Sequence, residues 1–209
     1  MPSFMDLAQE TKTVSLFAIC GVIAPLLFAI LVITAASLRT GYSHVSQFIS
    51  ELGYGSNAVV QNADFVLTGL LVILFSYGLH KGVGGGLGSR VGPAFVAAFG
   101  VGLIGAGVFP GDPALPTIQM SHVLFASVAE IAGAAVPLVM CRRLAKDPSW
   151  RGYATLSLLT GIVGLVLLIV FYVGVFGSGI LDPWKGAVQR LFWAVPFLWI
   201  EFAAVKLLK

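Results

Sequence analysis

Six long apolar stretches are the feature that most constrains this chain. They cover residues 14–38, 65–79, 91–109, 120–141, 156–176 and 191–208. A helix that crosses a bilayer needs about 20 mostly apolar residues, and five of these stretches reach or approach that length alone. We therefore predict an all-α polytopic membrane protein, in which residues 1–209 form one six-helix domain. Its spans are expected at about 14–38, 62–80, 91–109, 120–141, 155–176 and 187–208.

The composition agrees with a chain that has little surface in water. Hydrophobic residues make up 58% and charged residues 10% of the 209 positions, whereas a soluble domain carries about 25% charged residues. Six spans with short connections use up the length, so we expect no separate soluble domain.

The distribution of Lys and Arg predicts the orientation in the membrane. Nine of the twelve lie in the N-terminal segment, the second and fourth connections and the C-terminal end, against three in the first, third and fifth connections. Connections on the cytoplasmic side carry such an excess. We therefore expect both termini in the cytoplasm, in a plasma or inner cell membrane. Orientation also explains the net charge of +3, so we expect no nucleic-acid partner.

The first connection is the longest and has a helical pattern. Its apolar residues recur at helical spacing, with polar residues between them: Tyr42, Val45, Phe48, Ile49 and Leu52. This pattern predicts a short amphipathic helix that lies on the outer surface or folds back over the mouth of the bundle.

The odd-numbered connections also hold a mixed set of polar residues. They include Ser43, His44, Ser46, Gln47, Ser50, Glu51, Asp112, Ser121, His122, Asp182, Trp184, Lys185, Gln189 and Arg190. Acids, bases and hydroxyls gathered at one end of a bundle are typical of a ligand pocket. They are equally typical of solvated loops, and the sequence leaves both interpretations open.

A Ser–His–acid hydrolase is one chemistry that this set permits. His122 would be the general base, Asp112 or Glu51 would orient it, and Ser46 or Ser50 would be the nucleophile. The chain has no G-x-S-x-G nucleophile elbow, which weakens the pattern.

Other residues are expected to bind a ligand. They are Arg190, Gln189, His44, Glu130 and Trp184, of which Arg190 is suited to a lipid phosphate. Glu130 lies about 12 Å deeper than His122 at the helical rise of 1.5 Å per residue, where an acid needs a partner. We expect Glu130 and Glu201 to be the ionisable residues inside the spans.

Neither a metal nor another cofactor is expected. His44 and His122 belong to outer connections, whereas His80 ends the second span on the inner side. Because the hydrocarbon core is about 30 Å thick, the three histidines cannot meet at one zinc ion, and a site of His44, His122 and a carboxylate is the zinc alternative left open.

Four glycines mark the third span: Gly100, Gly102, Gly105 and Gly107. Small residues let helix backbones approach closely. Packing within the chain is the simpler explanation, and contact between copies in a homo-oligomer is the alternative.

Several motifs together resemble a known family. They are the run from Gly41 to Gly53, the turn from Phe109 to Pro113, His122, and the pair Gln189 and Arg190. Over nearly the whole chain they look like the domain of unknown function 998 family of prokaryotic six-helix membrane proteins. More distantly, the first motif is similar to Frag/DRAM/Sfk-type membrane proteins, some of which act in lipid remodelling. The resemblance implies the architecture and draws attention to Ser46, Ser50, Glu51, Asp112, His122 and Arg190.

The function expected from the sequence is binding or modification of a membrane-lipid headgroup in an outward-facing pocket. An enzyme of this kind would be a membrane-embedded lipid hydrolase or an acyl-transfer enzyme. A small transporter or channel subunit is one alternative, which requires Glu130 and Glu201 on one continuous path. A non-catalytic assembly protein is the other.

Overall fold

The computed structural model describes residues 4–84 and 88–209, and within these ranges the chain is built from helices. The elements are α1 (Phe4–Ser37), η1 (Ile49–Gly53), α2 (Ala58–Gly82), α3 (Gly88–Val108), α4 (Pro116–Lys146), α5 (Arg151–Phe171), η2 (Tyr172–Gly177), η3 (Asp182–Trp184) and α6 (Lys185–Leu207). Six helical segments are long and apolar enough to cross a membrane. The structure thus confirms the predicted all-α architecture.

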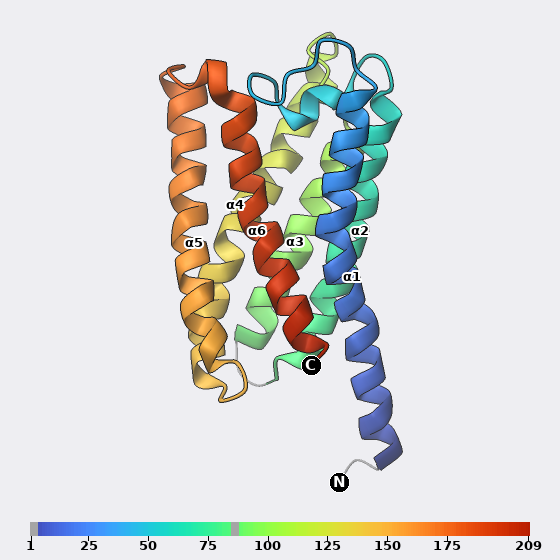
Figure 1. Ribbon diagram of the computed structural model, residues 1–209, viewed down its shortest axis with the longest axis vertical. Helices are drawn as coiled ribbons and strands as arrows, with labels where there is room; N and C mark the ends of the chain where they lie inside the picture. Colours follow the sequence, from blue (N-terminus) through green and yellow to red (C-terminus); the bar gives the residue numbers. More distant parts are fainter. Residues whose placement is uncertain (1–3, 85–87) are drawn as a thin grey trace.

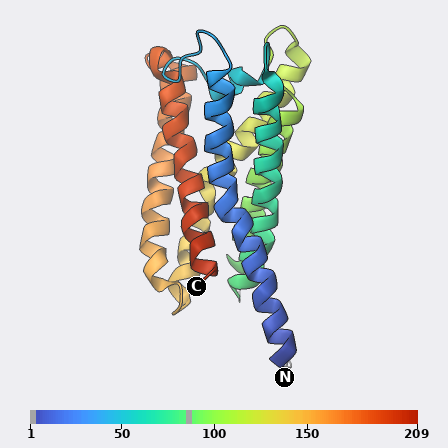
Figure 2. The same ribbon diagram turned by 45° about the vertical axis from the view of Figure 1, so that its right-hand side comes forward.

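The long helices run along one bundle (Figure 1) and form a closed ring through their contacts. Each packs against the next along the chain, and α6 returns to pack against α1. Both chain ends lie at the same end of the bundle in the two ribbon views (Figures 1 and 2). We call the opposite end the distal end; it holds the connections 38–57, 109–115 and 178–184. The odd-numbered connections therefore lie together, as the sequence predicts.

Aromatic residues fill the centre of the bundle. Phe28 of α1 packs on Phe197 of α6 with ring centroids 4.6 Å apart, and Phe99 of α3 packs on Trp193 and Phe197 at 5.7 and 5.4 Å. All four side chains are at most 7% exposed. Trp193 and Phe197 are four residues apart, so both lie on the face of α6 that meets the other helices.

The glycines of α3 let its backbone lie close to α2 on one side and to α4 on the other. A Cβ on Gly100 would lie 2.6 Å from a backbone oxygen of α2, and one on Gly102 would lie 2.5 Å from a backbone nitrogen of α4. Gly107 likewise faces α2, and Gly105 faces α4. These four positions therefore serve packing within the chain, the simpler of the two explanations.

The first connection contains a shorter helix than the pattern from Tyr42 to Leu52 suggests. Its helix is the five-residue 3₁₀ segment η1, which folds inward, with Ile49 and Leu52 each 2% exposed. Before it, Ser43 Oγ accepts hydrogen bonds from the Val45 and Ser46 amides. Such local side-chain bonds compete with a regular helix. The Glu51 side chain then accepts from the Phe48 amide at 3.0 Å, which fixes where η1 begins.

Candidate functional site

A cavity of about 490 Å³ opens at the distal end between η1, the 110–113 turn, α4, η2 and α6. We call it the distal pocket. Six of the polar residues singled out in the sequence line it: Ser50, Glu51, His122, Glu130, Lys185 and Gln189. Aromatic side chains of Phe48, Tyr54, Phe171, Tyr172 and Phe176 form much of its wall. This size and mixture are typical of a small-molecule site.

His122 is held in one tautomer in the wall of this pocket. Its ring is 6% exposed, and Nδ1 lies 2.9 Å from the carbonyl oxygen of Ala106 and 2.8 Å from that of Phe109. Carbonyl oxygens only accept hydrogen bonds, so Nδ1 carries the proton. In the neutral ring Nε2 then keeps a free lone pair, the state that a general base requires. A Cβ on Gly111 would lie 3.2 Å from Nε2, so glycine there leaves room beside this nitrogen.

The two carbonyl oxygens occupy the place expected for an orienting carboxylate. Asp112 does not line the pocket, and its Oδ1 accepts the Ala114 amide at 2.9 Å, an Asx-turn that a short acid before a turn favours. Glu51 lines the pocket, but its oxygens accept from the Phe48 amide and from Gln47 Nε2. The role assigned to Asp112 or Glu51 is therefore corrected: the backbone itself orients His122.

The two candidate nucleophiles separate in the structure. Ser46 lies in the turn before η1 and lines none of the three cavities described here. Ser50 lines the distal pocket and also a small cavity of about 20 Å³ beside it. His122, Glu130 and Gln189 line the same small cavity, which has room for about one water molecule. Ser50 is therefore the serine that shares two cavities with His122.

Gln189 joins α6 to η1 at the wall between these cavities. Its Oε1 accepts a hydrogen bond of 2.7 Å from the Ile49 amide, which ties the first turn of η1 to α6. The residue is 7% exposed. The position of Gln189 beside Ser50 thus depends on a hydrogen bond between residues that lie 140 positions apart in the sequence.

The floor of the distal pocket joins α4 to the end of α5. Glu130 lies two i+4 steps below His122 on the same face of α4. The Tyr172 hydroxyl donates to Glu130 Oε2 at 2.7 Å and also lies 3.1 Å from Ser127 Oγ. Sequence reasoning missed Tyr172 because it falls inside an apolar run, where a tyrosine near the span's end is a common interfacial residue.

Tyr172 also begins an unusual element. Residues Tyr172–Gly177 form the π-helix η2, and both Tyr172 and Phe176 line the pocket. Such segments are rare and are frequent at functional sites. The hydropathy of the sequence does not indicate where the α-helix α5 changes to the π-helix η2.

Charged groups gather at the mouth. Lys185 Nζ lies 3.7 Å from Glu51 Oε1 and 3.8 Å from Asp182 Oδ1, and it lies 4.9 Å from the centre of the Phe48 ring. Trp184 is 58% exposed and does not line the pocket.

Arg190 lies on the other side of the contact between η1 and α6. Its Nη1 donates to the carbonyl oxygens of His44, Gln47 and Gly186 at 2.9–3.1 Å, and its Nη2 donates to the Tyr42 hydroxyl. The guanidinium thus fastens the first connection to α6. Burial raises the pKa of Tyr42 even though the Arg190 charge opposes this.

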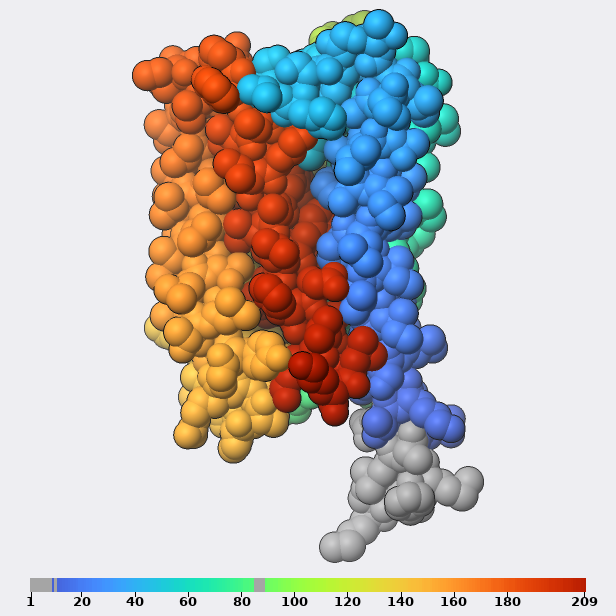
Figure 3. Space-filling view, viewed as in Figure 1, coloured from blue at the N-terminus to red at the C-terminus, as the bar shows by residue number. Residues whose placement is uncertain are grey.

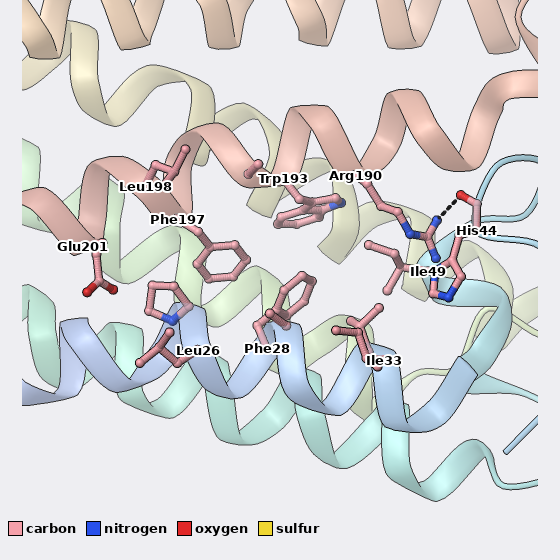
Figure 4. Close-up of a pocket in the computed structure, with 14 residues that line it drawn as sticks. Leu26, Phe28, Ile33, His44, Ile49, Arg190, Trp193, Phe197, Leu198 and Glu201 are labelled. Carbon is pink, nitrogen blue, oxygen red and sulfur yellow. Dashed lines mark hydrogen bonds between the residues drawn. The ribbon is translucent and has the colours of Figure 1, made fainter. Parts of the chain in front are cut away.

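Arg190 and His44 form the distal end of a second cavity, the lateral groove, of about 590 Å³ between α1 and α6. Figure 4 shows these two residues at one end and Glu201 at the other, with Phe28, Trp193 and Phe197 between them. In the space-filling view α1 and α6 lie side by side beneath the first connection (Figure 3). Burial, followed by the Arg190 charge, lowers the pKa of His44.

A third acid lies inside the spans, which corrects the expectation of only Glu130 and Glu201. Asp64 is 0% exposed, as are Gln61 and Thr68, which donate to it at 3.1 and 3.0 Å. Because α2 begins at Ala58 and not near residue 62, Asp64 falls within the helix and not in its first turn. Its donors lie on the same helix, and it lines none of the three cavities.

No group of three His, Cys, Asp or Glu side chains in the described ranges is arranged to hold a metal ion. The distal pocket is built from η1, the 110–113 turn, α4, η2 and α6. Among known proteins, one family model matches residues 22–206, and its description is "Protein of unknown function (DUF998)". The chain belongs to the DUF998 family. Comparisons with curated proteins and with solved structures give no match.

The family match confirms the resemblance read from the motifs. It covers all the residues that line the distal pocket of this DUF998 protein, from Phe48 to Gln189. The more distant similarity to Frag/DRAM/Sfk-type proteins stays a prediction.

Proposed function

We propose that this DUF998 protein binds the headgroup of a membrane lipid in the distal pocket and that His122 supports its chemical modification. The observation that carries the proposal is the state of His122. It combines a fixed Nδ1 tautomer with a free Nε2 in the wall of a pocket large enough for a headgroup.

The position of the pocket supports a lipid ligand. Its lining includes Val123 and Phe176, which are 55% and 62% exposed on the surface of the bundle, so apolar wall continues from the pocket to the surface that faces lipid. The excess of Lys and Arg at the other end of the bundle supports a distal end on the outer side. Lipids of the outer leaflet are then the ligands closest to the mouth.

The residues of the pocket support a transfer of the headgroup through Ser50. In this mechanism Nε2 of His122 takes the Ser50 hydroxyl proton as Oγ attacks the ester carbon or phosphorus. The departing alcohol oxygen then takes that proton back from His122 as its bond breaks. Water reverses the sequence and releases Ser50.

The transporter alternative is less well supported. It requires Glu130 and Glu201 on a single path, whereas Glu130 lines the distal pocket and Glu201 lines the lateral groove.

Photocrosslinking tests the binding site. The protein is placed in vesicles with a phospholipid that carries a photoreactive group near its headgroup, and crosslinked peptides are mapped by mass spectrometry. We expect crosslinks in residues 119–130 and 171–176. Ala126→Trp fills the pocket, because Ala126 lines it, and should reduce them on the order of tenfold. Val166→Trp is the control, since Val166 is 52% exposed elsewhere on α5. Equal crosslinking in both variants contradicts the site.

Turnover tests the role of His122. Wild-type protein and His122→Gln are incubated in the same vesicles, and new lipid species are quantified. Loss of a general base lowers the rate by about 100-fold or more, while crosslinking should persist. If the wild type produces no new species from any vesicle lipid, the base role is wrong and headgroup binding alone stands.

A further inference from the structure

Glu130 keeps one carboxyl oxygen without a partner at the floor of the distal pocket. The residue is 5% exposed and lines the pocket. Its Oε2 accepts from Tyr172, and in the described part of the chain Oε1 has no hydrogen bond. An acid within a membrane span is costly unless it is paired. A ligand with positively charged N–H donors would supply the hydrogen-bond partner and the opposite charge that the Glu130 carboxyl group lacks.

Aromatic rings surround the approach to that oxygen. The ring centroids of Phe171 and Phe176 lie 5.4 Å apart, and those of Tyr172 and Phe176 lie 5.8 Å apart. The ring centroid of Phe48 lies 5.9 Å from that of Phe171 and 5.9 Å from that of Phe176. Three of the rings belong to the α5–η2 junction and one to the first connection, so the cluster forms only in the folded chain. Aromatic faces beside a carboxyl group are the chemistry that recognises an ammonium ion.

The chain already places one ammonium group in such surroundings. At the mouth Lys185 Nζ lies 4.9 Å from the Phe48 ring centre and 3.7 Å from Glu51. The floor repeats this combination of ring and carboxyl group with Tyr172 and Glu130. At the floor, the described residues provide no lysine of their own.

An anionic group is less well suited to the same pocket. Lys185 is the single Lys or Arg among the described residues that line it, and Glu51 and Asp182 already pair with it. The guanidinium of Arg190 lies outside the pocket lining and is engaged by the first connection. The charged residues of the distal pocket therefore favour a cation over an anion at its floor.

We propose that the distal pocket selects lipids whose headgroup ends in a primary ammonium group, as in ethanolamine phospholipids, and that this group binds between Glu130 and the aromatic cluster. The inference rests on the proposed function and names its substrate class.

A competition between matched lipids tests the selection. Vesicles contain photoreactive phosphatidylethanolamine or photoreactive phosphatidylglycerol with identical acyl chains, and crosslinking within residues 119–130 and 171–176 is compared. Wild-type protein should favour the ethanolamine lipid on the order of tenfold. Glu130→Gln removes the charge while it keeps the size, and it should bring the ratio close to one without loss of total crosslinking. Glu201→Gln is the matched control, an acid that lines the lateral groove, and it should leave the ratio unchanged.

A second variant tests the same inference in case Glu130→Gln does not fold. Phe176 is 62% exposed, so Phe176→Leu is tolerated by the fold and should lower the preference several-fold by removing one ring. Pocket crosslinks that show no lipid preference in the wild type overturn this inference and leave the proposed function standing. A preference that persists in both variants also overturns it. The absence of any crosslink in the pocket overturns the proposed function itself.

Discussion

Arg190 illustrates how one residue holds the distal end together. Its guanidinium donates to three backbone carbonyls and one hydroxyl, which come from the first connection and from α6. Lysine keeps the charge, but a single ammonium nitrogen cannot reach four acceptors spread over this distance. We expect Arg190→Lys to lower the free energy of unfolding by about 2–4 kcal/mol, measured by unfolding in detergent micelles.

Hydrogen exchange provides a local readout of the same change. Amides in residues 42–49 should lose protection in Arg190→Lys, because their anchor on α6 is weakened. Arg151→Lys is the control, since Arg151 is exposed at the start of α5. Unchanged protection in both variants would show that Arg190 does not hold the connection.

The sequence predicts the members of the site better than their partners. Helical spacing places Glu130 beneath His122, and topology places Ser50 at the same end. The acceptors of His122 Nδ1 and of Arg190 Nη1 are backbone oxygens, which every residue type carries. No pattern of side chains can reveal such partners, and this is why Asp112 received a role that the backbone fills.

The docking of η1 against α6 depends on a glycine. A Cβ on Gly186 would collide with the backbone oxygen of Gln47 and lie 2.7 Å from that of His44. Because both contacts are backbone atoms, the connection would have to move as a whole. We expect Gly186→Ala to destabilise the fold by about 1–3 kcal/mol and to reduce headgroup crosslinking, measured on the same protein preparation.

Gly152→Ala separates this effect from a general response to alanine in a helix. Gly152 lies in α5 with no atom within 4 Å of a built Cβ, so helix propensity should stabilise this variant by about 0.5–1 kcal/mol. If Gly186→Ala behaves like Gly152→Ala, the contact of η1 with α6 is not required for the site.

Helices are predictable where the apolar residues of the sequence form one long regular run, and they are not predictable where the helix type changes to 3₁₀ or π. Long apolar runs predict the six long helices, since each must be long enough to cross the bilayer. The π-helix η2 and the 3₁₀ segment η1 both make hydrogen bonds to distant segments, Tyr172 to Glu130 and the Ile49 amide to Gln189. Both elements line the distal pocket, so the least predictable parts of the fold lie at the candidate site.

At the scale of the molecule, the two ends of the helix ring differ in the residues that they carry. Near the termini the described chain offers many basic residues, whereas the distal end gathers mixed polar groups around one pocket. Helix α6 closes the ring by packing against α1 and α5. The distal pocket and the lateral groove therefore both have a wall formed by α6, on opposite sides of its Gln189–Arg190 pair.

Orientation in the membrane is the prediction on which access to lipid depends. Cys20 and Cys141 are free thiols and are first replaced by serine. Single cysteines are then introduced at exposed positions, Ser56 and Ala114 at the distal end and Ser149 in the connection between α4 and α5. Since cytoplasmic connections hold the excess of Lys and Arg, a membrane-impermeant maleimide added to intact cells should label Ser56→Cys and Ala114→Cys. It should label Ser149→Cys only after the cells are opened. The reverse pattern would place the distal pocket in the cytoplasm, and headgroup selection would then have to operate on inner-leaflet lipids.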